Sequence, residues 1–523
     1  MSRSVLKSTG LVGALTLLSR ITGLVRDMIF AQAFGAGALM DAFLVAYKIP
    51  NFMRRLFAEG AFGHSFVPVI SEYRLRRTPG EVRGLVGDVA GTLGGVLLVG
   101  SLLGVIAAPL LILVFAPGFH ATPDKYQLTV QMLRWTFPYL FFISLTALCS
   151  GVLNSYQRFV VPALTQVVMN LVMIAVAVGV ALHSAHPGPV LAMGVFIAGV
   201  VQLLFQLPAV ARLRLLGMPR WRPAAEGVRR IAKLMLPGII GSSMAQVGLL
   251  LDTQIASFFI TGSVTWLYYA DRLVEFPLGI FSIALATVIL PGLSAHHVRR
   301  SAQEFSATLD WSLRLTVALV SPAAVGLLVF AGPIIATVFG HGKFNDLRDV
   351  QMAAWALVAY ALGLMGFSLV KVLAPGYFAR QDTRTPMRYG VLALIANVAL
   401  NLAVALPAAW LGFRAPHVLL AASTCLASTL NAVLLWRGLV RAGVYRAGPG
   451  WSVFLLRVLL ANALMALLLW WLGHDLSAWL ALGGGARVLR CAGSVLAGAA
   501  LYFAVLFAVG TRYNQPLGTD SPT

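Results

Sequence analysis

Charged residues interrupt the first two long apolar segments of a chain that otherwise carries few charges. The first segment contains Arg20, Arg26 and Asp27. The second contains a larger set of ionisable residues, namely Asp41, Lys48, Arg54, Arg55 and Glu59. An arginine at the centre of a bilayer costs about 3 kcal/mol on insertion scales, so intramembrane charges usually line a polar cavity. A cavity with more cations than anions predicts an acidic ligand and the transport of an anion.

The composition of the whole chain is that of a membrane protein. Of its 523 residues 59% are hydrophobic and only 11% are charged, and the mean hydropathy is +0.84. Because an apolar stretch needs about 20 residues to span a bilayer as a helix, we expect an all-α polytopic membrane protein with about 14 transmembrane helices. The expected spans are 9–34, 39–62, 85–115, 130–153, 161–182, 190–211, 234–260, 265–292, 309–339, 351–377, 388–409, 416–436, 453–473 and 487–509.

Most of the lysines and arginines behind the net charge of +21 lie in every second connection between the expected spans. The connection over 212–233 is the most basic of these. The positive-inside rule places such connections in the cytoplasm, and it therefore predicts a cytoplasmic N-terminus and C-terminus. This topology explains the basic composition without a nucleic-acid partner, and we expect none.

Two motifs recur at nearly the same spacing. The proline and serine that follow the second expected span recur 223 residues later, and the turn over 157–162 recurs 224 residues later over 381–386. We therefore expect two pseudo-symmetric six-helix bundles, over 1–217 and 218–446, and an additional helix pair with a C-terminal tail over 447–523. Transporters commonly bind their substrate between such halves.

Helical spacing arranges the charges of the second span. Asp41, Lys48 and Arg55 follow one another at intervals of seven and share one face, with Glu59 four residues further. Asn51 follows Pro50, which removes a helical hydrogen bond, and could satisfy the freed backbone group. Arg54, Arg55 and Glu59 also lie near the predicted cytoplasmic end. Their side chains could instead extend to the membrane surface.

Further charges lie on other expected spans. Arg20 and Asp27 share a face of the first span, and Asp271, Arg272 and Glu275 lie in the eighth. Asp41 and Asp271 either contribute to the ligand site or only neutralise nearby cations.

Asp252 lies deep in the seventh span, and its role has two interpretations. It is either half of a buried ion pair or a carboxylate that couples transport to a cation.

Enzyme and cofactor signatures are missing from the sequence. There is no phosphate-binding glycine motif, no Ser-His-Asp set and no metal-ligand spacing, and Cys149, Cys425 and Cys491 are dispersed in apolar spans. A membrane enzyme acting on lipid diphosphates would need a nucleophile with a base or an aspartate cluster. We therefore expect a transporter without a cofactor or metal.

Three stretches of the chain resemble the MurJ/MviN family of lipid II flippases. They are SRITGLVRDMIFAQAFGAGALMDAFLVAYKIPNFMRRLFAEGAFGHSFVPVISEY (Ser19–Tyr73), YADRLVEFPLGIFSIALATVILPGLS (Tyr269–Ser294) and KVLAPGYFARQDTRTP (Lys371–Pro386). The family belongs to the multidrug/oligosaccharidyl-lipid/polysaccharide exporter superfamily. The resemblance implies a flippase of the bacterial inner membrane. Its substrate would be the undecaprenyl-diphosphate-linked peptidoglycan precursor, moved from the cytoplasmic to the periplasmic leaflet.

The resemblance also implies roles for single residues. It places essential cavity arginines at Arg20, Arg26 and Arg272. The full expected set of substrate-binding residues is Ser19, Arg20, Arg26, Asp41, Lys48, Asn51, Arg54, Arg55 and Arg272, with Asp27, Glu59, Asp271 and Glu275 pairing charges.

Family properties extend beyond the cavity. The C-terminal helix pair is implied to form a groove for the lipid tail. Some members use sodium through carboxylates on the seventh and eleventh helices. Here Asp252 could contribute, but the span 388–409 has no acidic residue.

The expected partners are lipid II, membrane lipids and other cell-wall synthesis proteins, with the chain as a monomer. Alternatives are a flippase for another polyprenyl-diphosphate-linked oligosaccharide and a cation-coupled drug exporter, which would need an acidic cavity.

Overall fold

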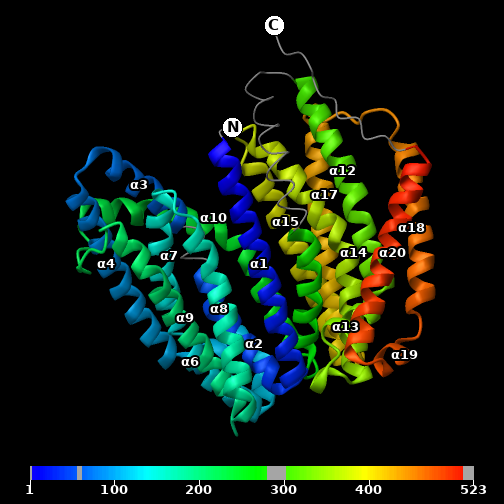
Figure 1. The fold of residues 1–523 in the computed structure, drawn as a ribbon, viewed down its shortest axis with the longest axis horizontal. Coiled ribbons are helices and arrows are strands. Elements are labelled where there is room, and N and C mark those ends of the chain that lie inside the picture. Colours follow the sequence, from blue (N-terminus) through cyan, green and yellow to red (C-terminus); the bar gives the residue numbers. More distant parts are fainter. Residues whose placement is uncertain (1–2, 56–61, 280–301, 511–523) are drawn as a thin grey trace. The chain divides into compact units, whose positions relative to one another are not determined.

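The computed structural model describes residues 3–55, 62–279 and 302–510, and these are almost entirely helical (Figure 1). No β-strand occurs within these ranges. The chain divides into two compact units, Met1–Thr265 (unit 1) and Trp266–Thr523 (unit 2). Each unit is a bundle of long helices held together by its own core.

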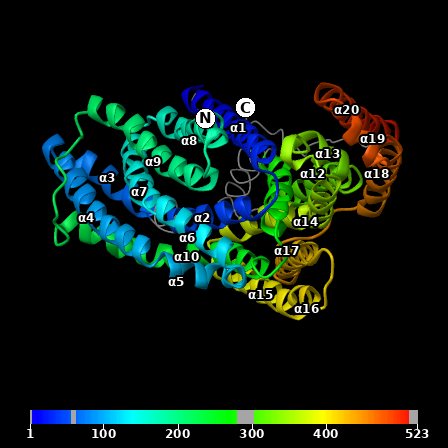
Figure 2. The ribbon, with the colours of Figure 1, turned by 90° about the horizontal axis from the view of Figure 1, so that it is seen from below.

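In unit 1, α1 packs against α8, α8 and α7 pack against α9, and α2 packs against α6. The helix α10 lies along α3 and α4 and reaches α5 at its other end (Figure 2). The bounds are α1 (Arg3–Phe34), α2 (Ala38–Arg54), α3 (Gly63–Arg76), α4 (Pro79–Ile106), α5 (Ala108–Phe115), α6 (Pro123–Thr136), α7 (Tyr139–Ser155), α8 (Val160–Gly179), α9 (Pro187–Arg212) and α10 (Glu226–Ala256).

In unit 2, α14 packs against α12 and α17, α15 packs against α17, and α18 packs against α20 and α12. A helix over 263–279 joins the two units along the chain. The other bounds are α12 (Ala302–Val329), α13 (Ala331–Val338), α14 (Leu347–Phe378), α15 (Arg384–Leu400), a π-helical turn (Asn401–Ala405), α16 (Leu406–Trp410), α17 (Pro416–Arg441), α18 (Trp451–Gly473), α19 (Leu476–Ala481) and α20 (Gly484–Ala508).

The all-α membrane fold expected from the sequence is confirmed. Each expected span coincides with helix in the described ranges, and ten helices there are long and apolar enough to cross a membrane. Some spans consist of two helices. The span 85–115 breaks between α4 and α5, where Pro109 cannot donate a helical hydrogen bond, and 130–153 breaks beside Pro138.

The internal repeat is present in the local backbone as well as in the sequence. Gln157 after α7 and Gln381 after α14 both adopt a left-handed conformation, with φ of 59° and 62°. In each case the next amide donates a hydrogen bond to the carbonyl five residues earlier, at 2.9 Å after α7 and 3.1 Å after α14. This is the Schellman pattern that ends a helix. The two bundles therefore share the same turn at equivalent places, which supports their pseudo-symmetry.

Unit 1 includes α10, although the repeat assigns this helix to the second bundle. At one end Arg230 forms an ion pair with Glu72 of α3 at 2.8 Å, and the hydrogen bond from Arg230 lowers the pKa of Glu72. At the other end Gln254 Nε2 donates to the Val114 carbonyl at 2.7 Å. A repeat is defined by sequence and local structure, so the boundaries at 217/218 and 446/447 stay predictions.

Gly118 allows the loop after α5 to approach the end of α10. Its amide donates to Ser257 Oγ at 3.0 Å, and a Cβ on residue 118 would lie 2.3 Å from the Ser257 carbonyl oxygen. Neither backbone segment can move aside without losing its own hydrogen bonds. Glycine is therefore the residue that permits this contact.

We expect Gly118→Ala to destabilise the protein by about 1–3 kcal/mol, because the added methyl group overpacks two backbones. Thermal unfolding of the detergent-solubilised protein measures the effect. Gly100→Ala is the matched control, since a Cβ there meets nothing within 4 Å. An unchanged midpoint for Gly118→Ala would contradict the assignment.

Candidate substrate-binding site

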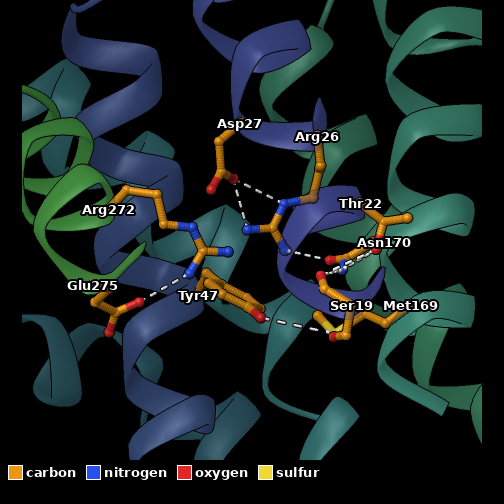
Figure 3. Close-up of polar contacts among 9 residues, drawn as sticks. All are labelled: Ser19, Thr22, Arg26, Asp27, Tyr47, Met169, Asn170, Arg272 and Glu275. Atoms are coloured by element: carbon orange, nitrogen blue, oxygen red, sulfur yellow. Dashed lines mark hydrogen bonds and ion pairs between the residues drawn. The ribbon is translucent and has the colours of Figure 1, made fainter. Parts of the chain in front are cut away.

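Arg26 lies inside unit 1 in a network of polar side chains from α1 and α8 (Figure 3). Its Nη2 lies 2.6 Å from Asp27 Oδ1, and its Nε donates to the same oxygen at 2.9 Å. Arg26 is 6% exposed and Asp27 is fully buried. Such a pair is retained in a low-dielectric interior only when further hydrogen bonds support it.

Asn170 of α8 supplies that further support. Its Oδ1 accepts from Arg26 Nη1 at 3.1 Å, and its Nδ2 donates to the Ser19 carbonyl and to Thr22 Oγ1, both at 3.1 Å (Figure 3). One amide thus joins the arginine to the preceding turns of α1. Asn170 is not among the residues predicted from the sequence, although a lone asparagine within an apolar span is itself a signal of a polar site.

Arg20 lies on α1 next to the Ser19 carbonyl that Asn170 binds, and both Ser19 and Arg20 are half-buried. The structure therefore brings Ser19, Arg26 and Asp27 into one network and keeps Arg20 on the same helix.

Asp41 is engaged in a separate buried cluster at the start of α2. Its Oδ2 lies 2.8 Å from Lys125 Nζ and accepts from the Gly262 amide at 2.8 Å. Its Oδ1 accepts from the Thr265 amide at 3.0 Å and from Thr265 Oγ1 at 2.7 Å. The carboxylate therefore caps the first turn of the helix over 263–279, which carries the positive end of the helix dipole.

This geometry favours charge neutralisation over ligand binding for Asp41. The pair is almost fully buried, at 1% exposure for Asp41 and 5% for Lys125, and the Lys125 ammonium lies 4.0 Å from the Phe119 ring centroid. Lys125 lies between the expected spans 85–115 and 130–153. The fold buries it because α6 packs against α2.

Two further cations of α2 have hydrogen-bond partners within unit 1. Arg54 Nε donates to Asn51 Oδ1 at 2.8 Å, and Arg54 is buried. Lys48 Nζ donates to Thr253 Oγ1 of α10 at 3.2 Å. Arg55 is half-buried at the end of α2, and Glu59 lies outside the described residues.

In unit 2, Arg272 Nη1 lies 3.2 Å from Glu275 Oε2 on the same helix (Figure 3). The side chains of Arg272 and Glu275 are 28% and 45% exposed, so this pair is far more open than the Arg26 pair. Asp271 is half-buried beside it.

The residues considered for ion coupling lie in both units. Asp252 is half-buried near the end of α10 in unit 1. In unit 2, the span 388–409 has no acidic residue but carries Asn397 and Asn401. Their side-chain amides form a hydrogen bond of 3.2 Å where the helix changes to a π-helical turn. No group of three or more potential metal ligands occurs among the described residues.

The fold and these charges define the class of protein. Apolar helices surround buried arginines that are held by amide and carboxylate groups, which is the construction of a polytopic membrane protein with polar sites inside its helical bundles.

Comparison with known proteins identifies the family. The family model described as lipid II flippase MurJ matches residues 30–483. A probable lipid II flippase MurJ of Haemophilus influenzae is 42% identical, over 96% of this chain and 99% of that protein. A lipid II flippase MurJ of Burkholderia cenocepacia is 40% identical, over 96% and 97%. The chain belongs to the lipid II flippase MurJ family, a family of transporters and not of enzymes.

A solved structure supports the same fold. A lipid II flippase MurJ in an inward closed conformation superposes with a TM-score of 0.76 and 24% sequence identity, covering 95% of this chain and 99% of that one.

We expect Asp41→Ala to destabilise the protein by about 3–5 kcal/mol, because it leaves the Lys125 ammonium buried without its carboxylate. Lys125→Met should cost less, since Asp41 keeps three other donors. Denaturant unfolding in detergent compares the two variants and their double mutant, whose cost should be less than additive. Arg77→Ala breaks an exposed pair with Glu81 and serves as the control, with an expected effect of at most about 0.5 kcal/mol. Additive costs would contradict the pairing.

We expect Asn170→Leu to destabilise unit 1 by about 1–3 kcal/mol, because it leaves buried groups of α1 without partners. Thr22→Val should cost little more in that background, since both changes remove the same hydrogen bond. A thermodynamic cycle measures this coupling, and Leu171→Ala, on the exposed face of α8, is the control. Independent effects of the two substitutions would show that Asn170 does not bridge the helices.

Proposed function

We propose that this chain moves lipid II, the undecaprenyl-diphosphate-linked peptidoglycan precursor, from the cytoplasmic to the periplasmic leaflet of the bacterial inner membrane. The observation that carries the proposal is the Arg26 network in a chain of this family. Proteins at 40–42% identity over almost their whole length bear the name lipid II flippase. The charge-pattern topology, with both termini in the cytoplasm, belongs to the same proposal.

The diphosphate is the part of the substrate that the arginines would recognise. A guanidinium binds phosphate oxygens through charge-assisted, often bidentate hydrogen bonds. In the structure Asp27 supplies an anion to Arg26 Nε and Nη2 at 2.9 and 2.6 Å. A diphosphate can replace this carboxylate as the anionic partner, while Asn170 keeps hold of Nη1. The guanidinium would then be oriented before the substrate arrives, which reduces the entropy lost on binding.

Transport would follow from alternating access between the two pseudo-symmetric bundles, with the headgroup in a cationic cavity and the lipid tail in the bilayer. Shielding the headgroup from the hydrocarbon removes the main barrier to crossing. An inside-negative potential favours outward movement of an anion by about 2.3 kcal/mol per charge per 100 mV. Arg20 and Arg272 are the further cations that we assign to this path, with Lys48, Arg54 and Arg55 in support.

The residues of this chain support sodium coupling through Asp252 less than they support the cationic path. Asn397 and Asn401 are neutral amides, which bind a cation less strongly than carboxylates. A drug exporter of the same superfamily is disfavoured because the charges of α1 and α2 are mostly basic.

We expect Arg26→Ala and Arg272→Ala each to reduce lipid II flipping at least tenfold, because each removes a charged partner of the diphosphate. The assay reconstitutes the purified protein in vesicles and follows lipid II that becomes accessible on the opposite leaflet. Lysine at either position should restore flipping only in part, since it lacks the bidentate fork. Arg77→Ala is the control at an exposed arginine. Normal flipping by both alanine variants at normal incorporation would refute the assignment.

A further inference from the structure

Four exposed arginines lie at neighbouring helix ends in unit 2. Arg384 and Arg388 occupy the first turns of α15, and Arg437 and Arg441 occupy the last turns of α17. The two helices pack side by side, and Figure 1 and Figure 2 both show them adjacent.

The contact between Tyr389 and Gly438 brings these arginines together. A Cβ on Gly438 would lie 3.1 Å from the Tyr389 hydroxyl and ring, so α15 and α17 touch at this point. Arg388 precedes the tyrosine and Arg437 precedes the glycine. Both pairs of arginines therefore surround one helix contact.

No carboxylate neutralises this arginine patch in the described part of the chain, where none of its four side chains makes a hydrogen bond or an ion pair. Asp382 is close in sequence, but its Oδ1 accepts from the Thr385 amide in the first turn of α15 at 3.0 Å. Basic residues at the corresponding end of unit 1 are used differently. Arg76 and Arg230 pair with Glu72, and Arg74 donates to the Ser155 carbonyl.

Apolar stripes continue from the arginines along both helices. On α15 the face of Arg384 and Arg388 continues through Leu392 and Ile395, which are 50% and 59% exposed. The opposite face is buried against the unit. On α17 the face of Arg437 continues through exposed apolar residues at the matching helical intervals, namely Val433, Leu430 and Leu426.

A cationic end followed by an apolar stripe has the shape and polarity of a single phospholipid. We propose that this patch binds the headgroup of an anionic phospholipid, whose acyl chains lie along the stripes of α15 and α17. Basic side chains at the membrane surface attract anionic headgroups by about 1 kcal/mol each. The apolar residues of the stripes are exposed on unit 2, and we assign them to a phospholipid of the surrounding leaflet, whereas the Arg26 network is assigned to the transported substrate.

The test counts lipids bound to the full-length protein in mild detergent by native mass spectrometry. The probes are dioleoylphosphatidylglycerol and, as a neutral lipid of equal chain length, dioleoylphosphatidylcholine. The wild type should bind the anionic lipid at least tenfold more tightly. The quadruple variant R384Q/R388Q/R437Q/R441Q should lose about tenfold in affinity for it, whereas the quadruple lysine variant should retain the preference.

The matched control is R158Q/R212Q/R214Q/R229Q, which removes the same charge from exposed arginines of unit 1. It should bind the anionic lipid as the wild type does. Equal loss in both glutamine variants would mean a general charge effect and would overturn the proposal, as would unchanged binding in the first. Displacement by millimolar inorganic phosphate would indicate a free-anion site and overturn the assignment to lipid. Flipping measured on the same variants after reconstitution in vesicles separates this outcome from failure of the proposed function.

Discussion

The cost of placing a charge in a medium without water governs the arrangement of this protein. A buried ion loses several kcal/mol of hydration free energy. Its attraction to an oppositely charged partner offsets this loss only when the geometry is good and further hydrogen bonds are made. Arg26 and Asp27 meet the condition through Asn170, and Asp41 and Lys125 meet it through the amides of residues 262 and 265. In both clusters the supporting groups come from a different helix. The contacts that stabilise these buried charges therefore also hold neighbouring helices together.

Arg487 shows a second solution to the same problem. It is buried at the start of α20, and its guanidinium donates to carbonyl groups instead of a carboxylate. The acceptors include Ala336 at 2.8 Å and Gly340 near the end of α13, and Leu480 at 2.8 Å and Leu482 at 3.1 Å near the end of α19. Helix C-termini carry partial negative charge, so two of them together stabilise a cation. This contact fastens the C-terminal helix pair to the rest of unit 2.

The other end of that pair is fastened by Asp310 of α12. Its Oδ1 accepts from Tyr445 and from Trp451 Nε1, both at 2.7 Å, and its Oδ2 accepts from Arg314 at 2.9 Å. The Tyr445 hydroxyl is the donor in this bond, and burial raises the pKa of Tyr445. Polar contacts thus fasten both ends of the helix pair, and large apolar side chains between these ends are exposed.

The sequence by itself determined the class of fold, and it predicted the chemistry of the site. Hydropathy is a local property, so the helical spans could be found from it, and the arginines of the first, second and eighth spans could be named as candidate ligands of an anion. The repeated turn at Gln157 and Gln381 was also visible, because a Schellman cap depends on neighbouring residues only. The tertiary structure decided which charges meet. Lys125 is 84 residues from Asp41, and Asn170 is 144 residues from Arg26. Contacts of that kind depend on how helices pack, and no local pattern in the sequence records them.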